Sequence, residues 1–217
     1  MDELWVNFNF KARYFKLGEI NSLTKAVWFV LHGYGHLAQY FIKKFESLES
    51  KGVCVIAPEG LSRFYLEDVN TRNQTGNNRV GATWMTRENR LMDIENYLTF
   101  LSTVYHAEVG NRTIPVTILG FSQGAATASR WAVQNKIRYE RLILWSGIFP
   151  DDMDFEKSKE VLKTKKVHQV YGSKDPFLND ARIGQMKGLA EKLGVTTPPV
   201  VFEGGHEFHD QTLLSFV

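Results

Sequence analysis

Residues 116–124 read Val-Thr-Ile-Leu-Gly-Phe-Ser-Gln-Gly, and this stretch decides the fold. Its apolar first half is typical of a buried strand, and the small residues spaced along 125–132 predict a helix directly after it. A G-x-S-x-G sequence between a strand and a helix places its serine on a sharp turn, with the hydroxyl above the sheet. Gly120 and Gly124 lack the Cβ atoms that would crowd such a turn. We therefore predict that Ser122 is a nucleophile.

Apolar runs recur on both sides of this stretch and alternate with helical patterns. The predicted buried strands are 26–31, 53–57, 116–119, 142–145, 167–171 and 200–202. The predicted helices have apolar faces that begin at Leu37, Leu91, Ala125 and Ile183. This alternation predicts an α/β fold with a mostly parallel central sheet and helices on both faces. We also expect an edge strand over 4–10, where apolar and polar residues alternate, and another over 13–17.

The segment 59–86 breaks this rhythm, because it is polar and rich in asparagine. A loop of this length in a compact domain is usually functional or disordered. It leaves from the C-terminal end of a predicted strand, where open α/β sheets bind ligands. We therefore predict one domain over 1–217, with 59–86 as an irregular loop near the site.

A serine hydroxyl is a weak nucleophile until a base takes its proton, so a histidine is needed. The chain order in this strand–turn–helix class is serine, acid, histidine, which excludes His32 and His36. His206 follows the last predicted strand, and two glycines before it allow a tight loop. His209 is the alternative, although it would lie within a final helix. We predict that His206 is the general base.

The acid that orients the histidine should lie on a loop after a strand, between the serine and the histidine. Asp175 meets this condition in the sequence Tyr-Gly-Ser-Lys-Asp-Pro at 171–176. The alternatives are Asp151, Asp152, Asp154 and Asp180. We predict that Asp175 fixes the tautomer of His206 and stabilises the imidazolium that forms.

Two backbone N–H groups should bind the developing oxyanion. The first is that of Gln123, the residue after the nucleophile, and the second is that of Tyr34 in the sequence His-Gly-Tyr-Gly at 32–35. The loss of one such donor typically lowers the rate by ~10²–10³. We hypothesise an acyl pocket formed partly by three aromatic residues, for each of which core packing is the alternative. These are Trp84, Phe121 and Phe177.

Composition and sequence patterns limit the partners, location and cofactors that this protein could have. The 217 residues are 43% hydrophobic and 23% charged, with a net charge of +2, so nothing indicates a nucleic-acid partner. No apolar run approaches the ~18 residues needed to cross a bilayer, and the N-terminus lacks the pattern of a signal peptide. We therefore expect no stable membrane insertion and a cytoplasmic location. No metal-ligand spacing, G-x-G-x-x-G or P-loop is present, so we predict no metal and no cofactor. The sequence leaves the oligomeric state open, and a homodimer is one state it allows.

From about Ala26 to the C-terminus the chain resembles the phospholipase/carboxylesterase family of small α/β-hydrolases, which includes acyl-protein thioesterases. The likeness rests on His-Gly-Tyr-Gly at 32–35, Gly-Phe-Ser-Gln-Gly at 120–124, Gly-Ser-Lys-Asp at 172–175 and Gly-Gly-His at 204–206. It implies the α/β-hydrolase fold and cofactor-free hydrolysis of a small-molecule carboxylic ester or thioester through an acyl-enzyme.

The chain departs from the family pattern at His36, where an Asp is frequent, at Ala125, where many members have Gly, and at Tyr171, where a His is common. These departures leave the substrate open. Acyl transfer or peptidase action would use the same three residues. A hydrolase fold kept only for binding is the non-enzymatic alternative.

Overall fold

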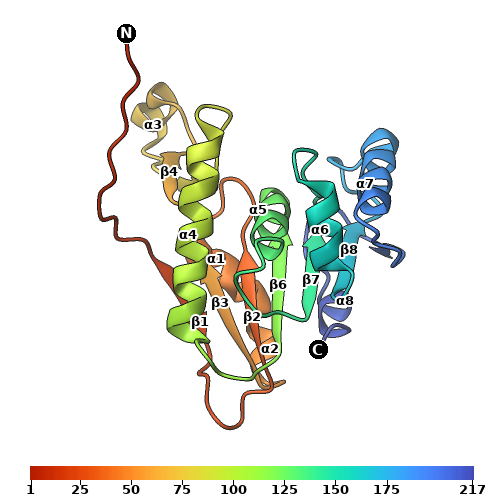
Figure 1. Ribbon diagram of the computed structural model, residues 1–217. Coiled ribbons are helices and arrows are strands. Elements are labelled where there is room, and N and C mark those ends of the chain that lie inside the picture. Colours follow the sequence, from red (N-terminus) through yellow and green to blue (C-terminus); the bar gives the residue numbers. More distant parts are fainter.

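A seven-stranded sheet forms the centre of the computed structural model, which describes residues 1–217 (Figure 1). The strand order is β1-β3-β2-β6-β7-β8-β9. The strands are β1 (Tyr14–Leu17), β2 (Ala26–Leu31), β3 (Val53–Pro58), β6 (Val116–Phe121), β7 (Arg141–Trp145), β8 (Lys166–Gly172) and β9 (Val200–Phe202). Only the edge strand β1 is antiparallel to its neighbour, and the other neighbouring pairs are parallel. The predicted α/β fold with a mostly parallel sheet is therefore confirmed.

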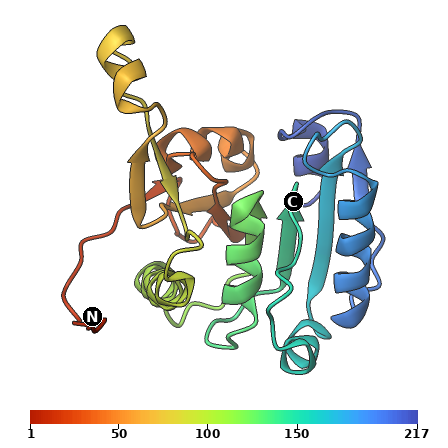
Figure 2. The ribbon, with the colours of Figure 1, turned by 90° about the horizontal axis from the view of Figure 1, so that it is seen from above.

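Helices cover both faces of this sheet (Figure 2). They are α1 (Ala38–Phe41), the 3₁₀ turn η1 (Ile42–Phe45), α2 (Glu46–Glu49), α4 (Arg90–Glu108), α5 (Gln123–Ala132), α6 (Phe155–Leu162), α7 (Asp180–Lys192) and α8 (Asp210–Leu214). The single helix predicted from Leu37 is thus divided into three short segments, although its apolar residues Phe41, Phe45 and Leu48 are buried as expected. None of the helices combines the length and the apolar character needed to cross a bilayer.

Two apolar clusters form the core, one on each side of the sheet. Alternate residues of β2 show the division, because Phe29 packs in the cluster of α4 and α5 whereas Trp28 packs in the cluster of α1 and α8. Side chains of a strand point alternately to opposite faces, so a strand buried on both faces needs an unbroken apolar run. This is why the runs in the sequence located the strands correctly.

The predicted strand over 4–10 is wrong. Residues 1–13 have no regular secondary structure, and the large apolar side chains of this segment are exposed. Sequence alternation indicates which residues could share a face, but a strand also needs a partner edge. The edge strand β1 pairs only with β3, and the segment 4–10 pairs with nothing. The strand expected over 13–17 is present as β1.

The segment 59–86 is more regular than predicted. It contains an antiparallel pair, β4 (Ser62–Tyr65) and β5 (Val80–Thr83), joined through the helix α3 (Val69–Thr75). Asp68 caps α3 by accepting hydrogen bonds from the N–H groups of Asn70 and Thr71, and Gly76 ends it with a left-handed backbone. Figure 2 shows that α3 projects away from the body of the molecule.

Candidate active site

Ser122 lies on a strained turn between β6 and α5. Its backbone angles are φ 54° and ψ −117°, a conformation that costs a non-glycine residue about 1–3 kcal/mol. The glycines on either side make the turn possible. A Cβ on Gly120 would lie 2.2 Å from the carbonyl oxygen of Gly124, and a Cβ on Gly124 would lie 2.2 Å from that of Leu31. The chain therefore holds a serine in an unfavourable conformation at the carboxyl edge of the sheet.

Two loops at the same edge bring His206 and Asp175 together. The Nδ1 atom of His206 lies 2.8 Å from Oδ2 of Asp175, and the other carboxylate oxygen accepts a hydrogen bond from the N–H of Phe177. The carboxylate side chain is fully buried, and the imidazole is 19% exposed. A carboxylate facing Nδ1 places the proton there, which leaves Nε2 as the free base.

Gly172 explains how these two loops come so close. A Cβ at this position would lie 2.3 Å from the carbonyl oxygens of both Gly204 and Gly205. Backbone hydrogen bonds from Ser173 to Phe202 and from Lys174 to Gly204 then join the loops. The Gly-Ser-Lys-Asp and Gly-Gly-His motifs therefore form one unit.

The residues considered as alternatives to Asp175 and His206 form other contacts or lie elsewhere in the fold. Asp152 forms ion pairs with Arg90 and Arg130, and Asp154 caps the start of α6. His209 caps the start of α8, where its Nδ1 accepts from the N–H of Thr212. Of the alternatives, only Asp151 lines the same cavity as Ser122.

The loop that carries Tyr34 lies beside Ser122 and is held by β5. A Cβ on Gly33 would lie 3.2 Å from Cβ of Ser122, so the loop approaches the turn closely. The N–H of Gly35 donates to the carbonyl of Ala82 at 2.9 Å, whereas the N–H of Tyr34 has no acceptor within the chain. The N–H of Gln123, at the start of α5, likewise has no partner within its helix. Both predicted oxyanion donors are therefore free.

The Gln123 side chain joins α5 to the end of β5. Its Nε2 donates to Oγ1 of Thr83 at 2.9 Å and to the carbonyl of Met85 at 3.0 Å, and its Oε1 accepts from the N–H of Trp84 at 3.2 Å. The Trp84 donor fixes the orientation of the amide, since an N–H must face the oxygen. The Thr83 hydroxyl, which accepts from Nε2, is then free to donate to the carbonyl of Met85 at 2.9 Å. This network ties the segment that holds the Tyr34 loop to the helix that carries the other donor.

His32 is a structural residue in the same assembly. Its Nδ1 faces the carbonyl of Gly33 at 2.8 Å, and its Nε2 accepts from the N–H of Gly60 at 2.9 Å. The ring stacks on Trp84, whose indole N–H donates to the His32 carbonyl at 2.8 Å. Burial lowers the pKa of His32 to about 4. The neutral ring, with its proton on Nδ1, is the form that satisfies both contacts.

Glu59 supports this assembly from the end of β3. Its buried carboxylate accepts hydrogen bonds from Nε of Arg13 at 2.8 Å, Nε of Arg63 at 2.7 Å and the N–H of Ala38 at 3.1 Å. Burial tends to raise the pKa of Glu59, but these three donors outweigh it and lower the pKa. The residue adjoins Gly60, the donor to His32. Glu59 could not be found from the sequence, because a single acidic residue after a strand forms no recognisable motif.

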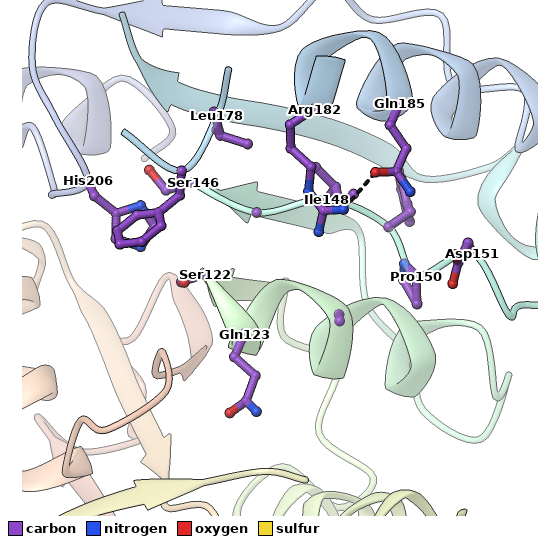
Figure 3. A pocket seen from close by; sticks show the side chains of 14 residues that line it. Ser122, Gln123, Ser146, Ile148, Pro150, Asp151, Leu178, Arg182, Gln185 and His206 are labelled. Carbon is purple, nitrogen blue, oxygen red and sulfur yellow. Dashed lines mark hydrogen bonds between the residues drawn. The ribbon is translucent and has the colours of Figure 1, made fainter. Parts of the chain in front are cut away.

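Ser122 and His206 open into one cavity of about 280 Å³ (Figure 3). The cavity lies between α5, the segment after β7 and the start of α7. Phe177 lines it and meets the His206 ring edge-on, with the ring centroids 4.7 Å apart. Phe121 is buried and packs against the His206 ring at 4.9 Å, and Trp84 is buried against His32. Of the three aromatic residues predicted for the acyl pocket, Phe177 alone lines this cavity.

Residues 23–211 match the family described as Serine hydrolase (FSH1). The chain belongs to this family. The serine hydrolase predicted from the sequence is thereby confirmed. A comparison with curated proteins found no match.

Solved structures with this fold include three named esterases or thioesterases. Esterase PE8 is 20% identical, with a TM-score of 0.67, and 95% of this chain and 96% of that chain are covered. Acyl-protein thioesterase 2 of Zea mays is 15% identical, with a TM-score of 0.70 and the same coverages. A phospholipase/carboxylesterase of Dyadobacter fermentans is 19% identical, with a TM-score of 0.61 and 96% of each chain covered. At these identities the likeness shows the α/β-hydrolase fold that the resemblance predicted.

Much of the cavity wall of this serine hydrolase consists of residues that the sequence did not predict. The additional residues come from the segment after β7 and from the start of α7. They include Ser146, Ile148, Pro150, Leu178, Arg182 and Gln185. The first three follow the carboxyl end of a strand, which is the usual place for ligand contacts in such sheets and was the only available signal.

No three His, Cys, Asp or Glu side chains are grouped so that they could hold a metal ion.

Proposed function

We propose that this serine hydrolase cleaves carboxylic ester or thioester bonds through an acyl-enzyme on Ser122, with His206 as general base and Asp175 as the residue that orients it. The observation that carries the proposal is the 2.8 Å contact between His206 Nδ1 and Asp175 Oδ2 beside a serine with a φ of 54°. Ser122 and His206 share one cavity, so a substrate there can reach both.

In the first half of the proposed reaction, Nε2 of His206 takes the proton of Ser122 as Oγ attacks the acyl carbonyl carbon. The N–H groups of Tyr34 and Gln123 bind the resulting oxyanion. When the tetrahedral intermediate collapses, His206 gives the proton to the leaving alkoxide or thiolate, and the acyl group stays on Oγ. A water molecule then attacks the acyl carbon with the same base, which releases the acid and restores Ser122.

One observation supports an ester or thioester as the substrate, and a second indicates that its acyl group is small. The names of the structural neighbours are those of an esterase, an acyl-protein thioesterase and a phospholipase/carboxylesterase. The cavity of about 280 Å³ is slightly smaller than the ~300–1,000 Å³ typical of small-molecule sites. We therefore expect short acyl chains to be cleaved faster than long ones.

Hydrolysis of 4-nitrophenyl esters from acetate to laurate tests the proposal, with Ser122→Ala as the inactive variant. Ser215→Ala is the matched control, because this exposed serine lies at the end of α8, outside the cavity. We expect a rate maximum at short chains in the wild type and in Ser215→Ala, and no turnover in Ser122→Ala. Equal rates in all three proteins would refute the assignment. Addition of an acceptor alcohol separates acyl transfer from hydrolysis.

The cytoplasmic location and the homodimer remain predictions from the sequence. Cell fractionation and light scattering of the purified protein would test them.

A further inference from the structure

The cavity beside Ser122 contains a cation that has no anionic partner. Arg182 reaches from α7 into this cavity in Figure 3, and its Nη1 donates to Oε1 of Gln185 at 2.6 Å. It forms no ion pair within the chain, although other arginines near the site do. Arg90 and Arg130 both pair with Asp152, and Arg63 pairs with Glu59.

Arg182 and its partner Gln185 both present hydrogen-bond donors to this part of the cavity. Oε1 of Gln185 is occupied by the guanidinium, so its Nε2 remains available to donate. The guanidinium has no acceptor atoms, so Arg182 and Gln185 together offer N–H groups to a ligand. A carboxylate has acceptor oxygens only, and it matches the planar fork of an arginine.

The backbone of Arg182 is also held at a fixed place relative to the proposed acid. Asp175 accepts the N–H of Phe177 through its side chain and the N–H of Leu178 through its carbonyl. Asn179 then caps α7 by accepting the N–H of Arg182. The helix that carries the arginine therefore begins directly at the end of the acid loop.

The other charges that face the cavity limit the ligand to a single negative charge. Asp151 lines the far end, beyond Gln185 as seen from Ser122 in Figure 3, and His206 lies beside Ser122. One guanidinium balances one carboxylate, whereas a phosphate dianion would keep an unbalanced charge near Asp151. We propose that Arg182 and Gln185 bind a carboxylate on the substrate, so that the preferred esters carry this group on the acyl or the alcohol part. This inference rests on the proposed hydrolysis.

Pairs of esters that differ in charge test this inference. On the acyl part, mono(4-nitrophenyl) adipate is compared with 4-nitrophenyl hexanoate. On the alcohol part, 4-acetoxybenzoate is compared with its methyl ester. The measurement is kcat/KM of the anionic ester divided by that of the neutral one, after subtraction of the uncatalysed rate. The pair of esters with the higher ratio shows whether the acyl or the alcohol part of the substrate carries the carboxylate.

We expect the ratio of one pair to exceed unity and to fall about tenfold in Arg182→Gln, since a charge-assisted hydrogen bond is lost and solvent exposure weakens that bond. Arg182→Lys should give an intermediate ratio, because it keeps the charge without the fork. Lys187→Gln removes a charge from the same helix outside this cavity and should leave the ratio unchanged.

Equal ratios in the wild type and Arg182→Gln, with neutral esters still cleaved, would overturn the inference and leave the proposed hydrolysis intact. An equal loss in Lys187→Gln would also overturn it, because the effect would then come from the general charge of α7. No cleavage of any ester by the wild type would instead refute the proposed function itself.

Discussion

The Gln123 side chain provides the sharpest test of how the site is built, because one amide joins both predicted oxyanion donors. Replacing it with Met keeps the length and apolar volume of the side chain and removes three hydrogen bonds, to Thr83, Trp84 and Met85. The backbone N–H of residue 123 remains. We therefore expect the folded variant to lose activity mainly through the position of the donors.

The structure sets the size of the expected effect. Neutral hydrogen bonds each contribute ~1 kcal/mol net, and a buried donor left without a partner costs ~1–3 kcal/mol. The N–H of Trp84, a residue that is 1% exposed, would become such a donor. We expect Gln123→Met to lower the free energy of unfolding by about 3 kcal/mol, and the Tm by about 10 °C in a chain of this length.

Activity should fall mainly in kcat. Complete loss of an oxyanion donor costs ~10²–10³ in rate, so a displaced Tyr34 loop should lower kcat by about 10- to 100-fold. KM should change less, because most of the cavity wall comes from the segment after β7 and from α7. The assays are steady-state hydrolysis of a short neutral ester and thermal unfolding.

Gln169→Met is the matched control. Gln169 is also a buried glutamine, but its Nε2 has no hydrogen-bond partner, so its replacement should change stability little and leave kcat unaltered. A Gln123→Met protein with the stability loss but wild-type kcat would refute the link between the side chain and the oxyanion donors. A wild-type Tm would refute the hydrogen-bond network itself.

Three other predictions follow from the fold that supports the site. As the pH falls from 7.5 to 5, His32 should lower the free energy of unfolding by about 2 kcal/mol. The reason is that its pKa of about 4 in the folded protein lies below the unfolded value of ~6.5, so the unfolded state takes up the proton first. Urea titrations should show this loss reduced in His32→Gln, and an unchanged pH dependence would contradict the assignment. Gly124→Ala should unfold the protein or abolish activity, since the added Cβ would lie 2.2 Å from the carbonyl oxygen of Leu31. Gly188→Ala is the control, because a Cβ there would point into open space on α7, and we expect this change to be tolerated or to stabilise the protein by ~0.5–1 kcal/mol. A folded, active Gly124→Ala would show that the turn is less crowded than described. Glu59→Gln should cost about 2 kcal/mol, because two arginines lose a charged acceptor, and calorimetry with no loss would contradict this.

The central part of the fold could be predicted from the sequence, and the three residues proposed for catalysis also follow from sequence patterns. An unbroken apolar run indicates a strand buried on both faces, and the glycines of Gly-Phe-Ser-Gln-Gly indicate a crowded turn. The positions of Asp175 and His206 follow from chain order and from the strands before them. Their 2.8 Å contact agrees with that reasoning.

The remaining features depend on contacts between distant segments. The segment 4–10 alternates like a strand, but it pairs with no edge of the sheet. Trp84 was a reasonable pocket candidate, yet its indole N–H faces the carbonyl of His32, which places it in the core. Arg182 gives no signal in the sequence, because an arginine in the first turn of an amphipathic helix resembles any other surface residue.

The most direct test of Ser122 as the nucleophile is to trap the acylated or phosphonylated enzyme and locate the modification by peptide mass spectrometry. The protein is incubated with a fluorophosphonate probe, digested and mapped, with Asp175→Asn and Ser122→Ala in parallel. We expect one adduct, on the peptide that contains Ser122, with much slower labelling in Asp175→Asn and none in Ser122→Ala. An adduct on another serine, such as Ser146 in the same cavity, or no adduct at all, would contradict this assignment of the nucleophile.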